Sequence, residues 1–96
     1  MSDVQGRDNP AENRYEAWLD GELAGFAVYG LSEHAIVFLH TEVDDRFGGK
    51  GVGSSLARGA LDDVRAQGER DVVALCPFIK GWIAKHPDYQ DLLHKR

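Results

Sequence analysis

The chain has 96 residues, the length of one compact domain, which argues against an enzyme built from two domains around a large cleft. Its hydrophobic fraction of 43% is close to the globular average, and its charged residues, 28% of the chain, are too mixed in sign for a disordered tail. The net charge of -5 argues against general nucleic-acid binding, which needs clustered Lys and Arg. It weakly favours cationic partners such as amines or basic peptides.

Cysteine content and hydropathy bear on the compartment. The single cysteine excludes an internal disulfide, and no apolar stretch approaches the ~20 residues needed to span a bilayer. The first ten residues lack the apolar run of a secretory signal. We therefore expect a cytoplasmic protein without a membrane partner, present as a monomer or a weak dimer.

The N-terminal segment shows no periodic pattern. Residues 1–12 are polar and contain Gly6 and Pro10, which is typical of a flexible lead-in. The folded domain is predicted to span residues 13–96.

Three strands are predicted in the first half of this domain. Residues 14–19 alternate between apolar and polar side chains, the turn residues Asp20-Gly21 follow, and residues 22–31 return as a second strand. The run 35–39 is apolar at consecutive positions, which predicts a central strand covered on both faces.

The second half changes period. Residues 51–67 place apolar side chains at three- and four-residue spacings, which predicts a helix ending at Gly68. The run 72–76 is short and apolar, as in a buried strand, and a helix is expected from Pro77 to His86, with one more turn after it. The predicted fold is α+β, with the order β-β-β-α-β-α, a mixed, mostly antiparallel sheet and one parallel crossover.

Four glycines lie where a strand passes into the predicted helix, at positions 48, 49, 51 and 53. Glycines allow a ligand to approach the backbone, and the first amides of a helix have no internal acceptor, so this turn suits phosphate or pyrophosphate. Lys50 and Arg46 can add charge from the rim. The spacing matches neither a P-loop nor a dinucleotide fingerprint. Glycine clusters also occur in loops that bind nothing, so this interpretation stays open.

These residues resemble the GNAT N-acetyltransferase superfamily, whose acetyl-coenzyme A loop reads Gln/Arg-x-x-Gly-x-Gly/Ala between a strand and a helix. Two registers match in part: the stretch 48–53, where Gly48 replaces the first residue, and the stretch 46–51, which begins with Arg46. The resemblance is closer to a branch of roughly ninety residues. Its motifs appear here as His40-Thr41-Glu42-Val43, Cys76-Pro77-Phe78 and His86-Pro87-Asp88-Tyr89.

The resemblance implies a GNAT-like fold, acetyl-CoA as the acyl donor, and an amine as the acceptor. Members of the branch lack the extra N-terminal strand and helices that shape an acceptor pocket in larger relatives. Phe78 and Trp82 follow the last strand and are core residues by default, although they are also placed to line a pantetheine channel. The expected cofactor contacts are Val43, Arg46, Gly48, Gly49, Lys50, Gly51, Val52, Gly53, Ser54, Cys76, Phe78 and Trp82.

Acyl transfer to an amine needs a proton acceptor and often a nucleophile or acid. Cys76 is predicted at the end of the last strand, where it can accept the acetyl group, protonate the departing thiolate, or simply fill the core. His40 and Glu42 are two residues apart, hence on one face, and are candidate proton acceptors. The histidine spacing does not predict a metal site.

The sequence thus predicts an acetyl-CoA-dependent N-acetyltransferase acting on an unidentified amine, either a small molecule or a protein lysine or N-terminus. Two alternatives remain: a non-catalytic coenzyme A binding module, and an interaction domain that binds no cofactor.

Overall fold

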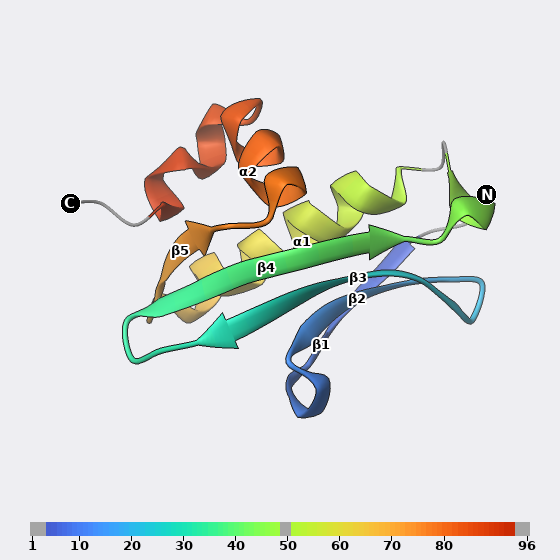
Figure 1. The fold of residues 1–96 in the computed structure, drawn as a ribbon, viewed down its shortest axis with the longest axis horizontal. Helices are drawn as coiled ribbons and strands as arrows, with labels where there is room; N and C mark the ends of the chain where they lie inside the picture. The colour runs from blue at the N-terminus through green and yellow to red at the C-terminus, as the bar shows by residue number, and fades with distance from the viewer. Residues whose placement is uncertain (1–3, 49–50, 94–96) are drawn as a thin grey trace.

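The computed structural model describes residues 4–48 and 51–93, and within them five strands form one sheet in the order β1-β2-β3-β4-β5 (Figure 1). Neighbours from β1 to β4 pair antiparallel, whereas β4 and β5 pair in parallel. The predicted α+β class, with its mostly antiparallel sheet and single parallel crossover, is confirmed. The strands are β1 (Val4–Asn9), β2 (Arg14–Leu19), β3 (Glu22–Leu31), β4 (Ala35–Val43) and β5 (Asp71–Ala74).

Two α-helices and three short 3-10 helices complete the fold of these residues. Helix α1 (Val52–Gln67) connects β4 to β5 and ends where Gly68 adopts a φ of 65°, as predicted. Helix α2 (Pro77–Ala84) follows β5. The 3-10 helices are η1 (Pro10–Glu12), η2 (Asp45–Phe47) and η3 (Pro87–Leu92), the last in place of the predicted final helical turn.

Strand β1 corrects the prediction of an irregular lead-in over residues 1–12. Val4–Asn9 pairs along its length with β2, from Val4 opposite Leu19 to Asn9 opposite Arg14. The strand escaped prediction because only Val4 is apolar, and at the edge of a sheet backbone pairing stabilises a strand without a buried side-chain pattern. The chain therefore does have an N-terminal strand, in addition to the predicted three before α1.

The turn between β2 and β3 follows the prediction. Asp20 and Gly21 both have positive φ, 52° and 79°, the combination of a two-residue hairpin turn whose twist matches its strands. Because this turn fixes the register, Leu19 pairs with Glu22 directly across it.

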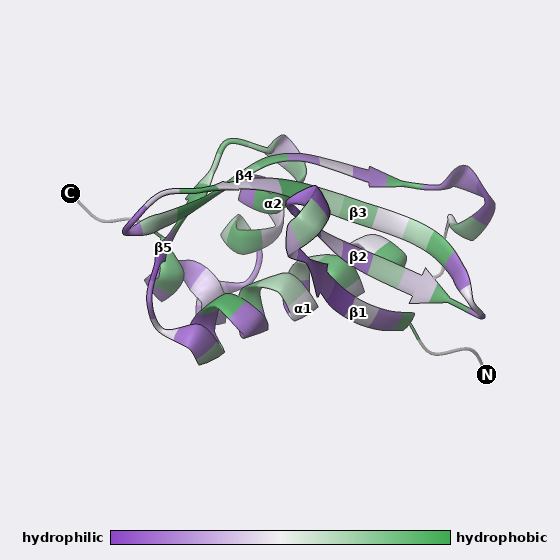
Figure 2. Ribbon diagram, turned by 90° about the horizontal axis from the view of Figure 1, so that it is seen from below, coloured by the Kyte–Doolittle hydropathy of each residue, from purple (hydrophilic) through white to green (hydrophobic). Residues whose placement is uncertain are grey.

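Helices α1 and α2 lie on the same side of the sheet. Tyr15 of β2 donates a hydrogen bond to Asp63 of α1, and Trp82 of α2 donates one to Ser54 of α1. Neither α-helix lies on the opposite side of the sheet in Figures 1 and 2, and we call this side the open face.

Strand β4 differs from its prediction. We expected it to be central and covered on both faces, but β3 is the middle strand and β4 is buried only toward the helices. Ile36 and Phe38 are at most 3% exposed, whereas Leu39 is 47% exposed on the open face. The apolar run 35–39 therefore did not indicate burial on both faces, because neither α-helix covers Leu39 on the open face.

Among the residues that the structure describes, the buried charged side chain is Glu16 of β2, which lies on the open face and is 3% exposed. Its carboxylate accepts hydrogen bonds from Asn9 (2.9 Å), Arg14 (2.8 Å) and Trp18 (2.9 Å). Burial alone raises its pKa, but these hydrogen bonds and the charge of Arg14 outweigh it, so the pKa of Glu16 is lowered. The ionised carboxylate therefore ties β1 to β2.

We predict that Glu16→Gln destabilises the protein by about 1–3 kcal/mol at pH 7, because an amide NH₂ would face one of the three donors. A lowered folded-state pKa stabilises the fold above the unfolded value and loses that contribution as pH falls through the folded value. Wild type should therefore lose more stability than Glu16→Gln between pH 6 and roughly pH 3.

Urea unfolding at several pH values measures this difference. Glu33→Gln is the matched control, because the Glu33 side chain is 89% exposed. Parallel stability curves for wild type and Glu16→Gln would contradict the role of the carboxylate.

Candidate active site

Strands β4 and β5 separate beside the start of α2. Their pairing ends with Phe38 opposite Ala74. The amides of Leu75 and Cys76 then both donate to the carbonyl of Phe38, at 3.0 and 2.9 Å, which closes the ladder. Beyond that point β4 continues to Val43 with β3 as its described strand partner on one side. The other side of β4, over residues 39–43, is an unpaired strand edge within the described part of the chain, and an extended molecule can bind there.

An irregularity in β4 decides which side chains face this opening. The register between β3 and β4 shifts after Phe38, where Tyr29 pairs with Phe38 but Val28 pairs with His40, so Leu39 is an extra residue. Thr41 therefore lies on the side of the helices, together with Phe38, instead of on the opposite side.

This shift brings Thr41 to Cys76. The Oγ1 atom of Thr41 lies 3.2 Å from the Sγ atom of Cys76, and Cys76 is 2% exposed. Thr41 was not predicted as part of the site, because simple alternation from Phe38 would point it to the open face. Thr41 does belong to the His-Thr-Glu-Val motif. The sequence of that motif does not reveal, however, that Leu39 just before it forms a bulge. Cys76 itself lies two residues beyond β5, as the N-cap of α2.

We predict that Thr41→Val slows the acetyl transfer expected from the sequence by roughly tenfold, because the Cys76 thiol loses a hydrogen bond of about 1–1.5 kcal/mol that orients it. Thr41→Ser retains the hydroxyl and should keep most activity. Steady-state rates with acetyl-CoA and an amine measure both. Equal rates for Thr41→Val and wild type would remove Thr41 from the site.

The predicted proton acceptors pair with each other but not with Cys76. His40 Nε2 and Glu42 Oε2 lie 3.2 Å apart, and each side chain is 60% exposed. Both lie on the open face, opposite Val28 and Phe26, whereas Cys76 is buried on the helix side. The structure thus places the His40–Glu42 pair and the Cys76 thiol on opposite faces of the sheet at the same opening.

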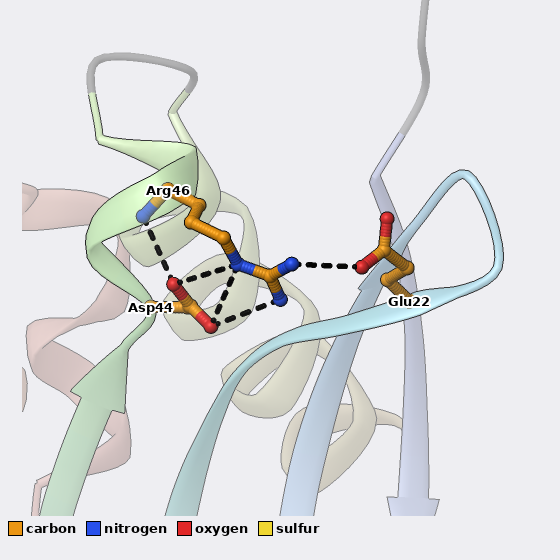
Figure 3. A network of polar contacts seen from close by, with 3 residues as sticks. All are labelled: Glu22, Asp44 and Arg46. Atoms are coloured by element: carbon orange, nitrogen blue, oxygen red, sulfur yellow. Dashed lines mark hydrogen bonds and ion pairs between the residues drawn. The ribbon is translucent and has the colours of Figure 1, made fainter.

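The glycine turn follows η2. Asp44 caps η2 by accepting from the Arg46 amide at 2.9 Å, and it also binds the Arg46 guanidinium at 3.2 Å (Figure 3). A second carboxylate, Glu22, binds Arg46 at 3.1 Å. The hydrogen bond to Asp44, its charge and the charge of Glu22 raise the pKa of Arg46. The positive charge of Arg46 is therefore already paired with two carboxylates of the protein.

The remaining predicted residues surround the first turn of α1. Gly51 is its N-cap with a φ of 75°, and Val52 is 2% exposed, so Val52 can offer a ligand its backbone rather than its side chain. The first hydrogen bond of the helix runs from the Ser55 amide to the Gly51 carbonyl at 3.0 Å, which leaves the earlier amides of the turn without intrahelical acceptors. Gly49 and Lys50 lie outside the described residues.

Helix α2 closes over this turn. A Cβ added to Gly53 would lie 2.9 Å from the Phe78 ring, and Trp82 Nε1 donates to Ser54 Oγ at 3.0 Å. Phe78 is 41% exposed and Trp82 only 7%. The structure therefore brings Gly53, Ser54, Phe78 and Trp82 together, with Phe78 available to a ligand.

The described residues contain neither a cluster of metal ligands nor a helix suited to spanning a membrane. Among the described residues, no group of three or more His, Cys, Asp or Glu is arranged to hold a metal ion. Across the same residues, none of the helices combines the length and apolar character of a membrane span.

The arrangement combines an open strand edge, the N-terminus of a helix and a thiol. The model of the GCN5-related N-acetyltransferase family matches residues 14–92 of the chain. The chain belongs to this family. The match begins at β2, so β1 precedes it. None of the curated proteins is similar enough to count as a match.

Two solved structures resemble this family member. An NMR structure of a GCN5-like protein from Staphylococcus aureus is 26% identical, has a TM-score of 0.72, and is matched over 100% of this chain and 93% of its own. The crystal structure of Ard1 from Thermoplasma volcanium is 30% identical with a TM-score of 0.54, over 69% of this chain and 46% of its own. The GNAT-like fold is thus shared with a protein of similar size and with part of a larger one.

The three motifs of this GNAT domain take different places. The motifs containing His40 and Cys76 meet where β4 and β5 separate. The third supports α2: the His86 ring stacks on Trp82 at 3.7 Å, and Tyr89 donates to Asp62 of α1 at 2.8 Å. Its residues therefore position the helix that carries Phe78.

Proposed function

We propose that this chain is an acetyl-CoA-dependent N-acetyltransferase that transfers an acetyl group to a primary amine. Family membership supports the reaction class. The observation that carries the proposal for this chain is the unpaired edge of β4, among the described residues, beside the first turn of α1. A strand edge suits the amide-containing pantetheine arm, and a helix N-terminus suits the diphosphate that follows it.

The diphosphate would be held by backbone amides. The first turn of α1 presents amides without intrahelical acceptors, and the helix adds roughly half a positive charge there. The space that a Cβ on Gly51 would occupy has no neighbour within 4 Å, and Gly53 leaves room for the Phe78 ring. Because Arg46 is held by Asp44 and Glu22, we assign the main attraction to these amides, supplemented by Lys50.

The pantetheine arm would extend along β4 over residues 39–43. Its two amides can pair with backbone groups there, as an added strand does. Val43 packs against the core at one end of this edge, and the exposed part of Phe78 can cover the arm from the side of α2. The thioester would then lie near Cys76, where β4 and β5 diverge.

Cys76 can act in either of two balanced ways. In the first, Sγ attacks the thioester carbonyl, the bond from that carbon to coenzyme A breaks, and the thiolate takes the proton of Cys76. The amine then attacks acetyl-Cys76 and the thiol re-forms. In the second, the amine attacks directly and Cys76 gives its proton to the departing thiolate. Thr41 orients the thiol in both.

A second candidate function is a coenzyme A binding module without turnover. It is favoured by one observation: His40 and Glu42 lie on the open face, while Cys76 is buried on the other side. A module of this kind needs the strand edge and the helix N-terminus but no proton acceptor beside the thiol.

Calorimetric titration with acetyl-CoA, followed by intact-mass analysis with and without an amine, tests the proposal. We expect saturable binding, amide shifts in NMR at the start of α1 and along β4, and an acetylated product amine. Acetyl on Cys76 before amine addition selects the covalent route. Binding without any product selects the binding module, and absence of binding contradicts both functions.

A further inference from the structure

The open face of the sheet is not uniformly polar near the point where β4 and β5 separate. In the described part of the chain, the exposed large hydrophobic residues are Leu31, Leu39, Leu75 and Phe78. The last three flank the separation, whereas Leu31 lies at the end of β3. Phe78 lies against Gly53 on the α1 side of the sheet. The exposure of Leu39 and Leu75 therefore needs a separate explanation.

Both leucines point to the open face. The Cδ1 atom of Leu39 lies 3.9 Å from where a Cβ of Gly30 would be, and Gly30 pairs with Val37. Leu75 is 63% exposed between Ala74, which packs against the core, and Cys76, which is inside it. Their backbones are adjacent, because the Leu75 amide donates to the carbonyl of Phe38. We call this pair the leucine shelf.

A negative charge accompanies the shelf. Glu42 lies on the same face, 60% exposed, with the His40 ring 3.2 Å away. A hollow of about 220 Å³ lies next to it, lined by Leu23, Phe26 and Glu42 among others. An apolar surface beside an exposed carboxylate complements a molecule that is cationic at one end and apolar at the other.

We propose that the acceptor is a primary amine carried on an apolar alkyl or aryl group, bound on the open face with its carbon skeleton on the leucine shelf. This rests on the proposed acetyl transfer. Glu42 attracts the ammonium, and the His40–Glu42 pair takes its proton so that the neutral amine can attack the thioester from the face opposite α1. The exposed pair returns that proton to water.

The experiment compares three acceptors, phenethylamine, ethanolamine and putrescine, at saturating acetyl-CoA. We expect kcat/KM for phenethylamine to exceed that for ethanolamine by about tenfold or more, since the larger apolar group buries more surface on the shelf. Leu39→Ser and Leu75→Ser should each lower kcat/KM for phenethylamine several-fold through KM. Leu31→Ser is the matched control and should leave both kcat/KM and KM for phenethylamine unchanged.

The outcomes separate this inference from the proposed function. Equal or better use of ethanolamine or putrescine by wild type, with acetyl-CoA bound and turned over, overturns the shelf and leaves the transferase standing. Failure of acetyl-CoA to bind overturns both. If sedimentation shows a dimer that Leu39→Ser dissociates, the shelf is an interface between two copies and the acceptor assignment is wrong.

Discussion

Cys76→Ala is expected to bind acetyl-CoA with nearly wild-type affinity and to transfer acetyl roughly 100-fold more slowly, the loss typical of a missing acid, base or nucleophile. The thiol is 2% exposed and contacts Thr41, so the substitution removes one atom at the strand separation and no part of the helix N-terminus. Binding and chemistry should therefore respond separately. Calorimetry and initial rates measure the two effects.

Cys76→Ser is the informative companion. The hydroxyl can keep the hydrogen bond with Thr41 but is a far weaker nucleophile and acid than a thiol. If Cys76 only fills the core, serine and alanine should both retain transfer and differ only in stability. Full activity in either variant would rule out the thiol as a participant.

The sequence predicted most element bounds because the signals were local. The hairpin at Asp20-Gly21 and the helix end at Gly68 depend on residues that adopt positive φ, and the structure has both. Strand β1, in contrast, forms because the edge of β2 is available for backbone pairing, which is a contact between separate segments of the chain. Its own residues contain no signal for that pairing.

The site was predicted in its parts but not in its geometry. The motifs containing His40 and Cys76 do meet, yet the extra residue Leu39 rotates the end of β4, so Thr41 reaches the thiol. A bulge inserts one residue without a distinctive side chain, so alternation counted along the sequence continues through it unnoticed. The placement of His40 and Glu42 on the open face follows from the same shift.

Gly51→Val is expected to weaken acetyl-CoA binding by at least about tenfold. Gly51 has a φ of 75°, a conformation that costs a residue with a side chain about 1–2 kcal/mol and a β-branched one more. Nothing lies within 4 Å of a Cβ at this position, so the protein interior would not be disturbed. The strain would instead move the turn and place methyl groups where the phosphates are proposed to bind.

Gly59→Val separates this effect from a general effect of valine in α1. Gly59 is an exposed residue of the same helix, again with nothing within 4 Å of the place a Cβ would take, but its φ is not positive. The two variants therefore differ in backbone strain and in distance from the first turn. Calorimetric titration should show near-normal affinity for Gly59→Val and weak affinity for Gly51→Val. Equal affinities would mean that the diphosphate is bound elsewhere, because a helix N-terminus attracts an anion only when its amides keep their direction.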